Sequence, residues 1–163
     1  LADTCRVWEA ATGPAEEAGV RVVWMRTGFP LHRDGGLLGP QLIPFRLGLA
    51  GRLGSGRQWQ PWIAMVDWLD AVELLLRRDD LAGPVNLVSP RPVTNAEFTR
   101  VLSRELGRPA VLPVPGFLLR ALLGEFGRDV LASKRVLPGA LLRAGFEFTH
   151  PDLPSALRAA LRE

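Results

Sequence analysis

Side chains that can hold a ligand gather in residues 54–78, which read GSGRQWQPWIAMVDWLDAVELLLRR. The guanidinium of Arg57 can bind phosphate oxygens through two hydrogen bonds, and its glycine neighbours would let it reach a ligand. Trp59 can stack on a ring, and Gln58 and Trp62 continue the polar, aromatic character of the loop. We therefore predict Arg57, Gln58, Trp59 and Trp62 as ligand-binding residues, although Trp62 also suits the packing of a protein core.

A second group, Thr27, Gly28 and Phe29, follows a run of apolar residues at positions 20–25. The run is rich in β-branched residues and comes shortly after a helical pattern, which predicts a strand buried on both faces of a parallel sheet. Ligands of open α/β sheets bind just beyond the carboxyl ends of the strands. We therefore predict that Thr27, Gly28 and Phe29 contact a cofactor or a substrate.

The other reactive residue types indicate neither a catalytic nor a metal site. Cys5 is the only cysteine, His32 and His150 are far apart in the sequence, and the chain contains no tyrosine. Asp67 precedes an apolar helical pattern, which predicts that it is the N-cap of that helix rather than a catalytic acid. We therefore assign no catalytic residue and no metal ligand.

Helices and strands are expected to alternate around these two groups. A strand, a crossover with a helix and a second strand are typical of parallel α/β structure, so we predict an α/β fold with a mainly helical final third. The expected strands span residues 20–25 and 85–88, and Phe146 and Phe148 suit an edge strand or an extended link. The expected helices span residues 2–18, 41–49, 94–107, 116–123, 129–133 and 138–144, with a break in the first at Gly13 and Pro14. A further helix starts at Asp67, with Leu69, Val72, Leu75 and Leu76 facing inward. Thr94 and Glu97 form a capping box at the start of the helix over residues 94–107, and Asp152 caps a last helix.

The composition is that of a folded globular chain without a nucleic-acid surface. The 163 residues are 47% hydrophobic, with a mean hydropathy of +0.11 and a formal net charge of only +3. The arginines are scattered, so we expect no nucleic-acid binding. The apolar runs are shorter than the ~20 residues of a membrane helix, so we expect no membrane contact and, with one cysteine, a cytoplasmic setting.

Three segments resemble a known family. Residues 22–28 read VVWMRTG, residues 83–98 read GPVNLVSPRPVTNAEF, and residues 35–67 read GGLLGPQLIPFRLGLAGRLGSGRQWQPWIAMVD. The last of these is similar to the run GGxLGxxLxPFRLGLGGxxGSGRQxxPWIHxDD. It is found in NAD-dependent epimerase family proteins with a C-terminal DUF1731 domain, which are atypical short-chain dehydrogenase/reductases. The similarity continues in residues 135–157 and so covers nearly the whole chain.

The resemblance implies the C-terminal half of such a protein. Residues 1–93 would be the last part of a Rossmann-like domain with two parallel strands, and residues 94–163 a small helical DUF1731-like domain. The chain begins with leucine, and we expect it to be part of a longer protein. The cofactor of the intact protein would be NAD or NADP, and the substrate a nucleotide-sugar or another small carbonyl or hydroxyl compound. We expect no tight cofactor binding to this chain alone, because the resemblance places the dinucleotide-binding glycine turn in the other half.

The chain departs from the family pattern at the residues that carry the chemistry. The family's YxxxKxxxE pattern aligns its glutamate with Glu9, which puts Leu1 and Cys5 at the tyrosine and lysine positions. The epimerase motif RxxIHVxD puts Gln60 at the position of its diphosphate-binding arginine, and the motif's histidine is lost too, so we expect Arg57 to replace that arginine. Three interpretations stay open: the substrate side of an NAD(P)-dependent nucleotide-sugar epimerase or oxidoreductase, a degenerate relative that binds a nucleotide without turnover, or an interaction module that self-associates through an exposed sheet edge.

Overall fold

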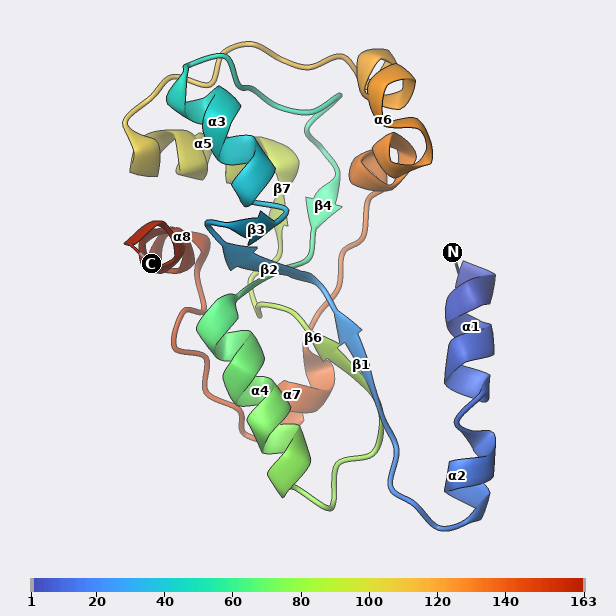
Figure 1. Cartoon of the computed structure of the whole chain (residues 1–163). Helices are drawn as coiled ribbons and strands as arrows, with labels where there is room; N and C mark the ends of the chain where they lie inside the picture. Colours follow the sequence, from blue (N-terminus) through green and yellow to red (C-terminus); the bar gives the residue numbers. More distant parts are fainter. Residues whose placement is uncertain (1, 163) are drawn as a thin grey trace.

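The computed structural model describes the backbone of residues 2–162 and the side chains within this range except those of residues 2, 122, 123, 126 and 129. Within this part, the strands pair in the orders β1–β6, β3–β2–β5 and β4–β7. Helices surround these small sheets, and α1 and α2 lie together on one side of β1 (Figure 1). The parallel pairs and the helices confirm the predicted α/β class.

Strands β1 (Val23–Thr27) and β6 (Gly83–Leu87) form the expected parallel pair. The prediction of a strand over residues 20–25 was wrong in two respects. The strand begins later, at Val23, and its last three residues are exposed. The side chain of Val23 packs against a hydrophobic core. Among the described residues, β1 pairs with one strand, β6.

The chain bends at Gly28 and passes from one sheet into the next. The Gly28 N–H donates to the Leu87 carbonyl at 3.0 Å, and the Phe29 N–H donates to the Pro61 carbonyl at 2.7 Å. The strand then continues as β2 (Phe29–His32), which pairs in parallel with β5 (Trp62–Ala64) and antiparallel with β3 (Gly35–Gly36). Gly28 therefore joins the two sheets and fixes the place where the carboxyl end of β1 lies.

Two hydrophobic cores lie on opposite faces of β5. Side chains alternate along a strand, so Trp62 and Ile63 point to opposite sides of the sheet. Trp62 packs with Phe98, Leu102 and Leu157 in the first core, whereas Ile63 belongs to the second. The core interpretation of Trp62 is therefore confirmed, since only 1% of its surface is exposed.

Helix α4 (Met65–Arg77) starts and faces differently from the prediction. It begins immediately after β5 with Ala64 as its N-cap, so Asp67 lies in the first turn and is not the cap. The buried stripe runs through Asp67, Ala71 and Leu75, which follow one another every four residues. The prediction that Leu69 and Leu76 face inward was wrong, because they lie off this stripe and are 53% and 73% exposed.

Helices α5 (Asn95–Leu106) and α8 (Leu153–Arg162) confirm their predicted caps. The Thr94 hydroxyl accepts a hydrogen bond from the Glu97 N–H, and Gly107 ends α5 in the left-handed conformation. The Asp152 carboxylate accepts from the Ser155 N–H at 3.0 Å at the start of α8. Both helices pack on the first core. The predicted domain boundary between residues 93 and 94 stays a prediction.

The remaining helices follow the predictions with shifted bounds, whereas the remaining strands, β4 and β7, were not predicted from the sequence. The first helical segment breaks as expected at Gly13 and Pro14. Helix α6 breaks at Gly124, whose backbone is not helical, in agreement with the two helices expected within residues 116–133. Phe146 and Phe148 form an extended link, with their rings edge to face at 4.8 Å. These elements are α1 (Ala2–Ala10), α2 (Gly13–Glu17), α3 (Gly39–Arg46), β4 (Trp59–Gln60), β7 (Val93–Thr94), α6 (Gly116–Leu131) and α7 (Gly139–Arg143).

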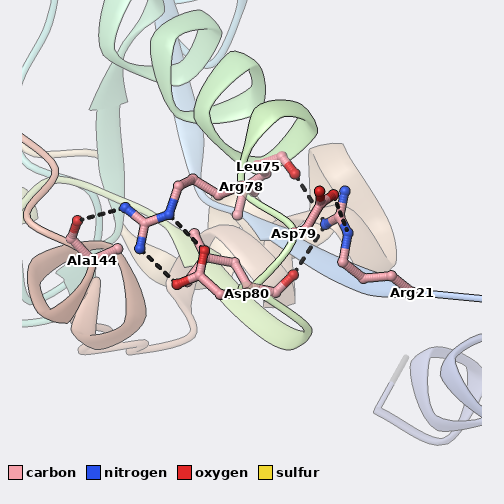
Figure 2. Close-up of polar contacts among 7 residues, drawn as sticks. Arg21, Leu75, Arg78, Asp79, Asp80 and Ala144 are labelled. Atoms are coloured by element: carbon pink, nitrogen blue, oxygen red, sulfur yellow. Dashed lines mark hydrogen bonds and ion pairs between the residues drawn. The ribbon is translucent and has the colours of Figure 1, made fainter.

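Two arginines hold the connection between α4 and β6 (Figure 2). Arg78 donates two hydrogen bonds to the Asp80 carboxylate, at 2.6 and 2.7 Å, and these lower the pKa of Asp80 to about 2. Arg21 donates to the carbonyls of Leu75 and Leu81, both at 3.0 Å. The connection therefore has a defined conformation, at the end of the parallel pair opposite to Gly28.

Candidate functional site

A large apolar pocket opens beyond the carboxyl end of β1. It lies between α3 and α6, which Figure 1 shows at the upper end of the molecule, and has a volume of about 670 Å³. We call it the α3–α6 pocket. Its only described polar side chain is Gln41, whose amide N–H donates to the Leu37 carbonyl at 2.7 Å. Its walls include Phe29, Pro30, Leu37, Pro40, Leu119 and Val130.

The three residues predicted at the strand end have different surroundings. Phe29 lines the α3–α6 pocket. Thr27 is exposed, and its hydroxyl accepts a hydrogen bond from the indole N–H of Trp68 at 3.3 Å. Gly28 packs against the chain itself, because a Cβ at this position would lie 2.3 Å from the Pro61 carbonyl oxygen. Of these three residues, Phe29 is therefore the one that lines the candidate pocket.

The close packing at Gly28 gives a testable prediction. Gly28→Ala is expected to lower the free energy of unfolding by about 1–3 kcal/mol, because the added methyl group meets a backbone carbonyl that cannot turn away. Urea unfolding of the intact protein measures this loss. Gly35→Ala is the matched control, since nothing lies within 4 Å of a Cβ there and its backbone φ is not in the left-handed region. An equal loss in both variants would contradict the packing argument.

Residues 57–62 divide into a buried and an open group. Gln58 is buried, with its amide N–H donating to the Leu53 carbonyl at 2.9 Å, and Trp62 is buried, with its indole N–H donating to the Arg91 carbonyl at 3.2 Å. Arg57 is exposed and Trp59 is partly exposed. The guanidinium of Arg135 lies over the Trp59 ring, 5.3 Å from its centre. Arg57 and Trp59 can thus meet a ligand, whereas Gln58 and Trp62 shape the loop that carries them.

Gln60 is the site residue that sequence reasoning missed. It lines a small hollow of about 20 Å³ together with Phe29, Trp59, Val130 and Lys134. Its Oε1 is buried, and no hydrogen-bond partner for it lies in the part of the chain that the structure describes. The available signal was the epimerase motif, which places a ligand-binding arginine at this position, so that a polar replacement there merited attention.

Asp67 is buried away from the pocket and anchors the fold. Its carboxylate accepts the Thr149 N–H at 2.7 Å and the His150 N–H at 3.1 Å. Burial raises the pKa of Asp67, and these two hydrogen bonds partly oppose that shift. With 1% of its surface exposed, Asp67 ties α4 to the segment before α8.

Of the positions aligned with the family's tyrosine, lysine and glutamate, Cys5 and Glu9 lie on α1. Leu1 is outside the described residues, and Cys5 is exposed. Glu9 makes two hydrogen bonds of 2.7 Å with Arg26 on β1, and these lower its pKa. Across the described residues, no group of three or more histidine, cysteine, aspartate or glutamate side chains is placed to hold a metal ion. None of the described helices has the length and apolar character needed to cross a membrane.

The expectation that glycines with dinucleotide-binding spacing belong to the other half of the protein was wrong, because such a spacing also occurs in this chain. Gly48, Gly51 and Gly54 do have the spacing GxxGxxG. However, they follow helix α3 and are followed by β4, whereas a pyrophosphate-binding turn joins a strand to a helix. Gly51 has a packing role, because a Cβ there would lie 2.1 Å from the Leu112 carbonyl oxygen.

A second hollow, of about 590 Å³, lies between α5 and residues 109–113 and is lined by Arg52, Arg100 and Arg104. Its charge suits an anion. It contains none of the residues predicted from the sequence, and it is not at a strand end. The α3–α6 pocket, which meets both conditions through Phe29, is therefore the candidate site.

The chain is similar in sequence and in fold to known proteins. The family described as a domain of unknown function, DUF1731, matches residues 114–160. An epimerase family protein of Mycobacterium tuberculosis is 46% identical over 158 residues, which are 96% of this chain and 52% of that protein. The crystal structure of human epimerase family protein SDR39U1 (isoform 2) with NADPH has a TM-score of 0.83 and 35% identity, over 88% of this chain and 49% of that one.

A further structure, the nucleoside-diphosphate sugar epimerase of Corynebacterium glutamicum, has a TM-score of 0.78 and 32% identity, over 98% of this chain and 30% of that one. The chain spans about half the length of the curated relatives it matches. The sequence, the Rossmann-like strand pair and the DUF1731 match agree with one another. The chain therefore belongs to the epimerase family, whose members share the fold of the short-chain dehydrogenase/reductases.

Proposed function

We propose that this chain forms the substrate side of the active site of an NAD(P)-dependent epimerase or oxidoreductase. The observation that carries the proposal is the α3–α6 pocket, which opens at the end of β1 and is lined by Phe29. Related proteins support the chemistry, since the human relative was crystallised with NADPH and the Corynebacterium one is called a nucleoside-diphosphate sugar epimerase. The substrate would be a nucleotide-sugar or another small carbonyl or hydroxyl compound.

The residues of this chain fit only one side of such a cofactor. We expect Thr27 and Phe29, which follow the strand end, to contact the cofactor through their side chains, because the N–H groups of Gly28 and Phe29 already bond to backbone carbonyls. The bound cofactor would supply hydride transfer. The apolar walls of the pocket would exclude water from the reacting carbon, and the exposed Arg57 and the partly exposed Trp59 would orient the substrate. Since the chain has no tyrosine, the proton-transferring group would lie outside it.

Filling the pocket tests this function in the intact protein. Val130→Trp is expected to raise KM for the best carbonyl or nucleotide-sugar substrate at least about tenfold, because the indole would occupy the space of the substrate. The measurement is NADPH- or NADH-linked turnover over a panel of such compounds. Leu142→Trp is the control, since this leucine is exposed on α7. Leu37→Trp blocks the opposite wall, so wild-type KM in both pocket variants would refute the proposal.

Binding without turnover is the second candidate, and the missing tyrosine and the cysteine at position 5 favour it. In that case the intact protein would bind NADPH or a UDP-sugar saturably but show no turnover with any member of the panel. Calorimetric titration beside the turnover assay separates the two functions. Self-association through the free edge of β1 is a further expectation, which a light-scattering mass equal to the monomer mass would contradict.

A further inference from the structure

We propose that Gln60 determines substrate specificity by accepting a hydrogen bond from an uncharged hydroxyl or N–H group of the ligand. The apolar part of the same ligand would occupy the α3–α6 pocket. This inference rests on the proposed function, because it takes that pocket to be the substrate site. It adds a residue and a substrate class to it: a largely apolar compound with one hydrogen-bond donor near its bound end.

The evidence begins with the burial of the Gln60 side chain. Only 4% of its surface is exposed, and its Oε1 has no hydrogen-bond partner among the described residues. A buried carbonyl oxygen without a donor is unfavourable, and folded proteins rarely leave one unsatisfied. A donor from a ligand, or a water that the ligand displaces, would satisfy it. The adjoining hollow of about 20 Å³ has room for about one such group.

The small hollow that Gln60 lines adjoins the α3–α6 pocket. Gln60 is the second residue of β4 and Gln58 immediately precedes this strand, so alternation along an extended chain places their side chains on the same side. The Gln58 amide reaches the carbonyl of Leu53, which itself lines the α3–α6 pocket. The small hollow beside Gln60 also shares Phe29 and Val130 with that pocket. A ligand in the pocket would therefore reach Gln60 through a shared wall.

The surrounding residues make this polar contact selective. The described walls of the α3–α6 pocket are apolar except for Gln41, whose amide donates to the Leu37 carbonyl. A carbonyl oxygen repels the oxygens of a phosphate or carboxylate but accepts readily from a hydroxyl or an N–H group. In an apolar site, a ligand that cannot satisfy such a group binds less tightly than one that can. The oxygen of Gln60 would thus favour ligand groups that donate a hydrogen bond at this point.

A matched pair of probes tests the inference in the intact protein. 2-Naphthol carries a hydroxyl donor, and 2-methoxynaphthalene has a similar ring system without the donor. Wild-type protein is expected to bind 2-naphthol about tenfold more tightly, as measured by equilibrium dialysis. Gln60→Met keeps the size of the side chain and removes its hydrogen-bond acceptor, so this variant should bind the two probes about equally. Gln41→Met, from the same pocket, should keep the wild-type preference.

The possible outcomes separate the two proposals. Equal binding of both probes to wild-type protein, or tighter binding of the methyl ether, would overturn the role of Gln60 and leave the pocket itself intact. Binding of neither probe would also overturn the inference about Gln60, whereas the KM values of Val130→Trp and Leu37→Trp decide the proposed function separately. Thermal unfolding gives a second readout. Gln60→Met should unfold at no lower temperature than wild type, because it removes an unsatisfied buried group, whereas a purely structural role would lower that temperature.

Discussion

Trp62→Ala is expected to lower the free energy of unfolding by about 3–5 kcal/mol, which is the usual loss when a large buried aromatic side chain is removed. Trp62 is 1% exposed in the first core, where it packs with Phe98, Leu102 and Leu157. The substitution would leave a cavity bounded by β2, α5 and α8, and its indole bond to the Arg91 carbonyl would also be lost. Urea unfolding of the intact protein, followed by far-UV circular dichroism, measures the loss.

Trp8→Ala is the control for this prediction, because Trp8 is 72% exposed on α1. Its substitution should change the free energy of unfolding by no more than about 0.5 kcal/mol. Trp62→Phe should cost less than Trp62→Ala, since a phenyl ring fills part of the cavity. A loss in Trp62→Ala as small as that in Trp8→Ala would show that the core is not organised around this residue.

The sequence predicted the elements that depend on local signals. Thr94, Gly107 and Asp152 act within a few residues of their own position, and the structure places all three as expected. The parallel pair of β1 and β6 followed from apolar runs separated by a crossover. What failed depended on contacts between distant segments. The start of α4 was misplaced because β5 runs directly into the helix at Ala64, which no cap residue marks.

The candidate site shows the same division. Phe29 was predicted from its place after a strand, which is a local property, and it lines the α3–α6 pocket. The burial of Gln58 and Gln60 depends on the pairing of β4 with β7, and these strands lie more than thirty residues apart in the sequence. A two-residue strand carries too little alternation to show which side chains point inward. The unpartnered oxygen of Gln60 could be found only from the folded chain.

Asp67→Ala is expected to lower the free energy of unfolding by about 2–4 kcal/mol, because it leaves the N–H groups of Thr149 and His150 without their acceptor in a part-buried place. Asp67→Asn keeps one amide oxygen that can accept from these groups, so its loss should be smaller. Exposed Asp3→Ala, whose carboxylate pairs only with Arg6 on the surface of α1, is the control and should change little.

The pH dependence of Asp67→Asn tests the electrostatic part of the same argument. Burial raises the pKa of Asp67 in the folded protein above its usual 3.8, so the folded state binds the proton more tightly than the unfolded state does. The contribution of Asp67 to stability is therefore greatest at low pH and declines as pH rises through the interval between 3.8 and the raised pKa. Since asparagine does not titrate, the stability of Asp67→Asn relative to wild type should increase over that interval. Urea unfolding at several pH values from about 4 to 7 measures this slope. A relative stability that falls with rising pH would mean that the Thr149 and His150 hydrogen bonds outweigh burial and that the folded protein prefers the carboxylate.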